Sequence, residues 1–139
     1  MFEKVSPVDI AVSGLKAQRV RMNLIANNIA NINTTRTPEG GPFRRQLAVF
    51  RGEQLEPFIE QSKFGLRVKK IIGDKTPFKQ VYDPSHPDAN ADGYVAYPNV
   101  DLAVEMVNLV AAHRAYDANV AVIGSSKRMR QKALEIIQA

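Results

Sequence analysis

Residues 99–139, NVDLAVEMVNLVAAHRAYDANVAVIGSSKRMRQKALEIIQA, contain no proline and a single glycine, Gly124. Apolar residues recur in this stretch at the seven-residue spacing of a helix that packs against another helix. One core position is filled by Leu102, Leu109, Tyr116, Ile123 and Ile137, and the other by Met106, His113, Val120 and Leu134. We predict a helix that follows Tyr97-Pro98 and has Asn99 as its N-cap. It would be roughly 58 Å long, whereas a compact chain of this size is only about 37 Å across, so a simple globule is excluded.

The same stretch contains a second set of apolar residues at helical spacing, beside the heptad positions. The set is Val104, Val107, Ala111, Ala115, Ala118, Val122, Met129, Ala133 and Ile136. A helix that is apolar on two sides is buried on two sides. A chain of 139 residues supplies a partner for only one of them. We therefore expect the second side to pack against other subunits, where the small alanine side chains allow helices to approach closely.

The partner for the first side is expected near the N-terminus. Ser6, Pro7 and Asp9 are typical of the N-cap, first residue and third-position acid of a helix. A heptad pattern follows and stops before Thr37-Pro38, because the prolines and glycines of residues 37–42 interrupt a helix. Its core positions are Val8, Leu15, Met22 and Ile29, and Ala11, Gln18, Ile25 and Ile32. The predicted intrachain coiled-coil seam consists of Val8, Leu15, Met22, Ile25, Ile29, Leu109, Tyr116, Val120 and Ile123.

Three asparagines, Asn23, Asn27 and Asn31, lie at four-residue steps on the helix face opposite this seam. Asparagine is a poor helix former. The row is either an ordinary solvated face or a row of amide groups that hydrogen-bond to neighbouring subunits. The predicted intersubunit interface combines it with part of the second apolar side and comprises Asn23, Asn27, Asn31, Val107, Ala111, Ala115, Ala118 and Val122.

Residues 43–97 have the two-residue period of strands rather than a helical period. Phe64, Leu66, Val68 and Ile72 alternate with mostly polar residues. Further strands are predicted from Phe43 to Arg51, from Phe78 to Tyr82 and from Tyr94 to Tyr97. The predicted fold is mainly α and elongated, with long N- and C-terminal helices that pair as a coiled coil. Its parts are the N-terminal helix in residues 1–36, a small β-rich insertion with loops in 37–97, and the C-terminal helix in 98–139.

Asp88, Asn90 and Asp92, within DANADG at 88–93, look like the opening of a calcium-binding loop. The twelfth position of such a loop should supply a bidentate glutamate, but here it is Asn99. Pro84 also excludes an entering helix. A polar turn with Asx hydrogen bonds is the favoured interpretation, and we expect neither a metal nor a cofactor.

The composition argues against an enzyme. The chain has no cysteine, which excludes disulfides, thiolate metal sites and cysteine nucleophiles. Its two histidines, His86 and His113, do not have the spacing of metal ligands. The sequence contains no Ser/His/Asp arrangement, phosphate-binding loop or HExxH helix. We therefore expect no catalytic residues.

The net charge of +5 arises in the middle of the chain, where residues 43–80 contain nine basic and four acidic residues. With aromatic residues between them, these basic side chains could contact phosphates while the rings stack on bases. A basic coiled-coil nucleic-acid-binding module is therefore the alternative function. A solvated strand face has the same pattern, and an acidic neighbouring protein or cell-wall polymer is a third candidate contact. The basic residues are Arg44, Arg45, Arg51, Lys63, Arg67, Lys69, Lys70, Lys75 and Lys79.

Neither a membrane span nor a cleavable signal is expected. The sequence has no run close to the ~18 consecutive apolar residues that a span needs. Its first residues, MFEKVSPVDIAVSG, contain two acids and a proline where a signal peptide needs an apolar stretch.

Two long motifs resemble a known family. Residues 13–45, SGLKAQRVRMNLIANNIANINTTRTPEGGPFRR, resemble the N-terminal signature of bacterial flagellar rod, hook and hook-associated axial proteins. Residues 83–100, DPSHPDANADGYVAYPNV, and 105–120, EMVNLVAAHRAYDANV, are similar to the proximal rod members of that family. The resemblance implies a structural subunit of the periplasmic rod in the flagellar basal body. Such subunits assemble helically into the drive shaft that transmits motor torque and encloses the export channel.

The resemblance also implies partners. These are copies of the chain itself, other rod proteins and the basal-body protein that joins the rod to the membrane ring. Family members pass through the flagellar type III export apparatus without a cleaved signal peptide. Binding to nucleic acid and insertion into a membrane are not implied.

Overall fold

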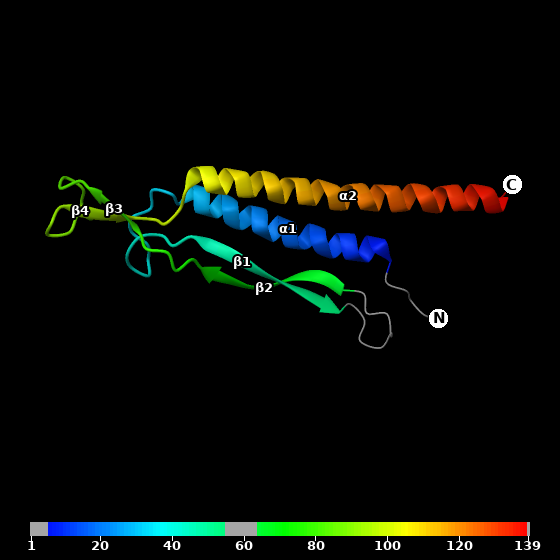
Figure 1. The fold of residues 1–139 in the computed structure, drawn as a ribbon, viewed down its shortest axis with the longest axis horizontal. Coiled ribbons are helices and arrows are strands. Elements are labelled where there is room, and N and C mark those ends of the chain that lie inside the picture. The colour runs from blue at the N-terminus through cyan, green and yellow to red at the C-terminus, as the bar shows by residue number, and fades with distance from the viewer. Residues whose placement is uncertain (1–5, 55–63, 139) are drawn as a thin grey trace.

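Two long antiparallel helices lie side by side in the computed structural model, which describes residues 6–54 and 64–138 (Figure 1). They are α1 (Pro7–Ala30) and α2 (Leu102–Gln138). Between them in the chain come the strands β1 (Gln46–Gln54), β2 (Phe64–Gly73), β3 (Lys79–Tyr82) and β4 (Tyr94–Tyr97). The prediction of two terminal helices around a β-rich middle is confirmed. Lys63, one of the basic residues of the middle, lies outside the described residues.

Helix α1 begins where its sequence predicts and ends earlier. The backbone N–H of Ser6 donates to Asp9 Oδ2 at 2.7 Å, and this hydrogen bond is the main reason that the pKa of Asp9 is lowered. The helix ends at Ala30 rather than just before Thr37. There the side-chain amide of Asn31 donates to the Asn27 carbonyl at 2.9 Å. Such local hydrogen bonds compete with continuation of the helix.

The predicted N-cap of the second helix is wrong, because the cap of α2 is Asp101 and not Asn99. Asp101 Oδ1 accepts the N–H of Val104 at 3.2 Å. The Asn99 amide is used elsewhere. Its Oδ1 accepts the Arg45 N–H at 2.9 Å, and its Nδ2 donates to the Asp74 carbonyl at 3.2 Å. Asn99 therefore joins the chain before β1 to the chain after β2.

The strands of the β-rich middle form two separate two-stranded antiparallel sheets. In the first sheet, Gln46 pairs with Gly73 and the register shifts at a bulge between Val49 and Phe50. Bulges increase the twist of a strand pair, and β1 and β2 cross in Figure 1. The predicted strand from Phe43 to Arg51 is thus displaced toward the C-terminus, whereas the predicted strand at Phe64 is confirmed. The second sheet, β3 with β4, lies at the end of the molecule away from the C-terminus (Figure 1).

Because the strands cross, backbone groups at the edges of both β1 and β2 lie next to α1. At one end the Asn28 side chain accepts the N–H of Gln46 at 2.8 Å and donates to its carbonyl at 2.9 Å. At the other end Ser13 Oγ accepts the N–H of Leu66 at 3.0 Å. Helix α1 lies between α2 and the first sheet, and its side chains satisfy backbone groups at strand edges.

The described helices contain few buried residues, and most of these are small or polar. They are Ala11, Gly14, Ala17, Ile25 and Asn28 on α1, and Glu105, Ala112 and Ser126 on α2. The surface area of the chain is 10139 Å², whereas a compact protein of 15.4 kDa would expose about 7,200 Å². Every residue from Lys127 to Gln138 is exposed, since this end of α2 extends past the start of α1 (Figure 1). Much of the helix surface therefore has no partner within the chain.

Gly14 allows the close approach of the two helices. A Cβ atom at this position would lie 2.8 Å from Oδ1 of Asn119, whose Nδ2 is held by the Ala115 carbonyl at 2.8 Å. Overpacking of this kind costs about 1–3 kcal/mol, and the gain in helix propensity from glycine to alanine offsets only about 0.5–1 kcal/mol. We expect Gly14→Ala to lower the free energy of unfolding by about 0.5–2 kcal/mol, measured by urea denaturation.

The matched control is Gly124→Ala on α2. A Cβ there would meet only Arg128 Nη1, at the ordinary contact distance of 3.6 Å. This change should raise the free energy of unfolding by about 0.5–1 kcal/mol. If both variants were stabilised equally, Gly14 would not be needed for helix contact.

Candidate assembly surface

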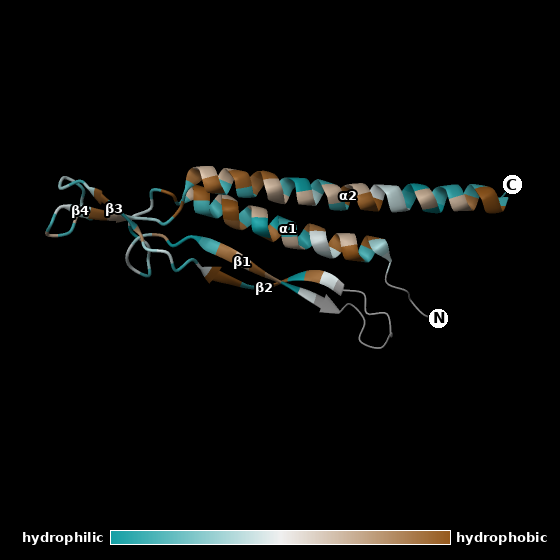
Figure 2. Cartoon of the chain, in the orientation of Figure 1, coloured by the Kyte–Doolittle hydropathy of each residue, from teal (hydrophilic) through white to brown (hydrophobic). Residues whose placement is uncertain are grey.

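An exposed apolar stripe runs along α2 on a face that does not contact α1. Figure 2 shows hydrophobic residues along this helix up to its C-terminal end. The large members are between 43% and 77% exposed, and Val107 is 71% exposed. We call the set the outer stripe, and it consists of Val104, Val107, Ala111, Ala118, Val122, Met129 and Ile136. Ala115, also predicted for the intersubunit interface, is half-buried beside it.

The predicted seam agrees only partly with the observed contact between the helices. Ile25 is buried, and the other predicted seam residues apart from Val120 are half-buried, namely Val8, Leu15, Met22, Ile29, Leu109, Tyr116 and Ile123. The assignment of Val120 is wrong, because its side chain is 47% exposed. Met106 and His113, which share its heptad position, are exposed too. The contact uses the position before them, occupied by Glu105, Ala112, Asn119 and Ser126.

The three asparagines of the predicted interface lie near the first sheet. Asn23 and Asn27 are exposed and Asn31 is half-buried. Asn27 Nδ2 donates to Gln46 Oε1 at 3.2 Å, and Asn27 Oδ1 accepts from Asn31 Nδ2 at 3.1 Å. Two of the three side chains thus already have hydrogen bonds within the chain.

A polar cluster around the buried side chains of Asn28 and Glu105 joins α1, α2 and the chain around the first sheet. We call it the polar junction, and it comprises Asn28, Arg45, Gln46, Asp74, Asn99 and Glu105. The Glu105 side chain is completely buried. Its Oε1 accepts from Arg45 Nε at 2.7 Å and from Arg45 Nη2 at 2.6 Å, and its Oε2 accepts from Asn28 Nδ2 at 3.1 Å. Both carboxylate oxygens are therefore paired, as a buried charge requires.

Hydrogen bonds shift the pKa values of Arg45 and Asp74 in the polar junction. Burial lowers the pKa of Arg45, but hydrogen bonds to Glu105 and Asp74 outweigh this, so the net shift is upward. The pKa of Asp74 is lowered, chiefly by the backbone N–H of Thr76 and also by Arg45. The Arg45–Asp74 distance is 3.2 Å. Two members had been singled out from the sequence, Arg45 as part of the basic group and Asn99 as the expected N-cap, whereas Asn28 and Glu105 were missed. Neither residue lies at a predicted heptad core position, so the apolar pattern gave no signal for them.

Two arginines of the basic group, Arg44 and Arg45, make contacts within the fold. Arg45 belongs to the polar junction, and the Arg44 guanidinium lies 4.2 Å above the centre of the Phe78 ring. Arg44 also donates to the Asp74 carbonyl at 2.6 Å. These contacts give no support to the alternative of a nucleic-acid-binding module.

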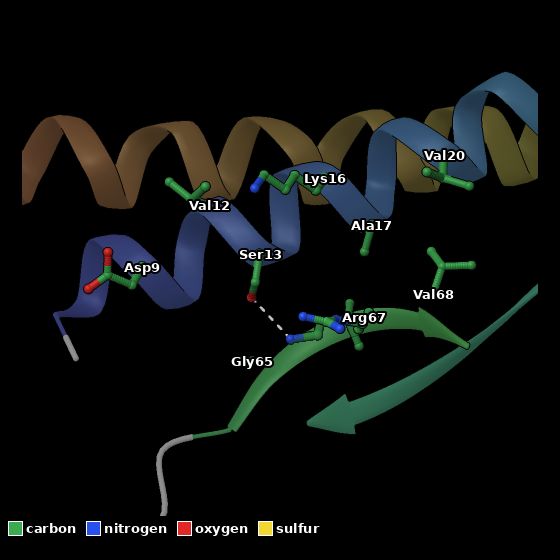
Figure 3. Close-up of a pocket in the computed structure, with 10 residues that line it drawn as sticks. Asp9, Val12, Ser13, Lys16, Ala17, Val20, Gly65, Arg67 and Val68 are labelled. Carbon is green, nitrogen blue, oxygen red and sulfur yellow. Dashed lines mark hydrogen bonds between the residues drawn. The ribbon is translucent and has the colours of Figure 1, made fainter. Parts of the chain in front are cut away.

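A groove of about 470 Å³ lies between α1 and β2 (Figure 3). Val12, Val20 and Val68 are among its lining residues, with Lys16 and Arg67. The Ser13 hydroxyl, which faces β2 in Figure 3, donates to the Ile10 carbonyl at 2.6 Å and accepts from the Leu66 N–H. The hydroxyl is thus engaged in holding the strand edge rather than placed as a nucleophile.

The side chains of the calcium-loop motif make separate hydrogen bonds. Asp88 accepts from Thr35 Oγ1 at 2.9 Å and pairs with Arg36 at 2.9 Å. Asn90 Oδ1 accepts the N–H groups of Asp92 and Tyr94 at 3.0 and 2.9 Å, which is an Asx turn. Across residues 6–54 and 64–138, no three His, Cys, Asp or Glu side chains gather as metal ligands.

No helix among the described residues has the length and apolarity to cross a membrane.

Comparisons with known proteins identify the family. Residues 9–36 match the family model described as flagella basal body rod protein, and residues 91–136 match that of the flagellar basal body rod FlgEFG protein C-terminal region. The chain is 45% identical to the flagellar basal-body rod protein FlgC of Borreliella burgdorferi, over 96% of this chain and 97% of that protein. It is 42% identical to FlgC of Bacillus subtilis, over 93% and 95%, and 42% identical to FlgC of Salmonella typhimurium, over 94% and 95%. The chain therefore belongs to the FlgC family of flagellar basal-body rod proteins.

Proposed function

We propose that the outer stripe of α2 is the surface by which this rod subunit packs into a helical shaft. Members of the family are structural proteins of the basal-body rod and not enzymes, and this chain has the same structural role. The observation that supports the proposed surface is the exposure of the outer stripe, with Val107 at 71% and Ile136 at 77%. Burial of each large apolar side chain stabilises an assembly by about 1.5–3 kcal/mol. Repeated along the helix, such burial would hold neighbouring subunits tightly together.

The assembled shaft transmits motor torque as shear and twist between helices packed on several sides. In this arrangement α1 and α2 pair as a coiled coil within each subunit, while the outer stripe pairs with a neighbour. The neighbours are copies of this chain, other rod proteins and the protein that joins the rod to the membrane ring. The shaft lies in the periplasm and encloses the export channel, and the subunit reaches it through the flagellar type III apparatus without a cleaved signal.

Cysteine labelling tests the proposed surface, because the native chain has no cysteine. In Val107→Cys, we expect a maleimide reagent to label the purified monomer completely and to leave intact basal bodies at least tenfold less labelled. The side chain should be reactive in the monomer because it is exposed, and protected in the rod because a neighbour covers it.

Basal bodies dissociated in urea before labelling serve as the control and should react like the monomer. Equal labelling of intact and dissociated basal bodies would refute the assignment of this surface.

A further inference from the structure

Two contacts between α1 and α2 share one register, and in a third the long side chain of Arg21 reaches one turn along α2 to donate to Asn108 Oδ1 at 3.4 Å. In an antiparallel pair, the numbers of facing residues have a constant sum. Asn28 contacts Glu105 and Gly14 adjoins Asn119, and both pairs sum to 133. The same register places Arg21 opposite Ala112 and Pro7 opposite Ser126. The α2 residues of the four pairs follow one another at seven-residue steps, from Glu105 through Ala112 and Asn119 to Ser126, which is the last buried residue before the exposed end of the helix.

The apolar surfaces of the two helices do not by themselves select this register. Four of the eight facing residues, Pro7, Gly14, Ala112 and Ser126, are small, so these positions would not block a slide by steric conflict. A slide of one heptad, about 10.5 Å, would give pairs that sum to 126. Glu105 would then face Arg21, and Ala112 would face Gly14. An ion pair and a close contact of two small residues make this a credible competing register.

We propose that Asn28 and Glu105 are positioning residues that select the observed register. The Asn28 amide is held on both sides, because it bonds the N–H and carbonyl of Gln46 as well as Glu105. Glu105 is held in turn by Arg45, next to Gln46 in the chain. Sliding by one heptad would separate Glu105 from both Asn28 and Arg45. The hydrogen bonds between these three side chains would then be lost. The slide would break the three interactions that Glu105 accepts from Asn28 and Arg45 and would offer it Arg21 alone in exchange, so the polar junction disfavours the competing register.

This selection determines where the outer stripe lies relative to the first sheet. The sheet is fixed to α1 through Ser13 and Asn28, whereas the outer stripe belongs to α2. A slide would therefore move the outer stripe about 10.5 Å past the first sheet. This consequence for assembly rests on the proposed function. The selection of the register by Asn28 and Glu105 does not depend on it.

Disulfide trapping in the purified full chain measures the register, again because the chain lacks cysteine. Ala11 and Ile123 are each one helical turn beyond the Gly14–Asn119 contact, so Ala11→Cys with Ile123→Cys reports the observed register. Ala11→Cys with Tyr116→Cys reports the register slid by one heptad. In the otherwise native chain, we expect the first pair to form its disulfide at least tenfold faster than the second.

The test variant combines Asn28→Leu with Arg45→Leu, which frees Glu105 from both partners. We expect the second pair to form its disulfide at least tenfold faster in this background than in the native one. Adding Arg21→Ala should reverse the increase, since it removes the partner of Glu105 in the slid register. If the polar junction only stabilised the fold, its loss would slow disulfide formation in both cysteine pairs to a similar extent. That outcome, or unchanged preference for the first pair, would overturn the proposal.

Discussion

Val107→Asp is expected to abolish motility and rod completion in a host that lacks its own FlgC and relies on this chain. Val107 is 71% exposed in the single chain, so a carboxylate there should not disturb the monomer. In the assembled rod the same position would be buried against a neighbour. Burial of an unpaired carboxylate costs several kcal/mol, in addition to about 1.5 kcal/mol or more of lost apolar contact. The cost recurs in every copy.

Swimming in soft agar and electron microscopy of purified basal bodies measure this effect, while export of the subunit should continue. Val120→Asp is the matched control, because Val120 is also exposed on α2 but lies outside the outer stripe. It should leave motility close to normal. Normal swimming of the Val107→Asp strain would contradict the role of the outer stripe.

Glu105→Ala is expected to lower the free energy of unfolding by about 3 kcal/mol or more, because one partner of a buried ion pair is lost. Arg45 would keep Asp74 at 3.2 Å but would lose two hydrogen bonds, and the Asn28 amide would lose one. A domain of this size is stable by only about 5–15 kcal/mol, so the loss should be plain in urea denaturation followed by circular dichroism.

Glu135→Ala provides the comparison on the exposed end of α2. Glu135 pairs with Lys132 at 2.8 Å, but both side chains are at least half exposed. Exposed pairs contribute about 0–1 kcal/mol, so this variant should unfold almost like the native chain. Equal losses in the two variants would show that the polar junction is not a stabilising core.

The helices could be predicted from the sequence because their determinants are local. The acid at Asp9 and the proline at Pro7 define the start of α1, and heptad spacing defines the length of α2. The strand at Phe64 followed from its alternation. The cap of α2 was assigned incorrectly because Asn99 and Asp101 are both good N-caps. Only a distant contact, between Asn99 and the chain before β1, decides between them.

The apolar pattern alone could not distinguish the side of α2 that contacts α1 from the side proposed for assembly. Both sides of α2 are apolar, so Val120 was placed in the seam although it is exposed. The observed contact is narrow, and at Gly14 only a small residue fits. Asn28 and Glu105 were missed for a related reason. In the sequence a polar residue on a helix is most simply assigned to the solvent-exposed face. Only the fold shows that Arg45, from a third segment of the chain, pairs with Glu105.

The most direct test is a density map of the purified basal body in which this chain is traced. We predict that Val104, Val107 and Val122 of each copy contact helices of neighbouring subunits. A map in which these three side chains face solvent or the open channel would contradict the account.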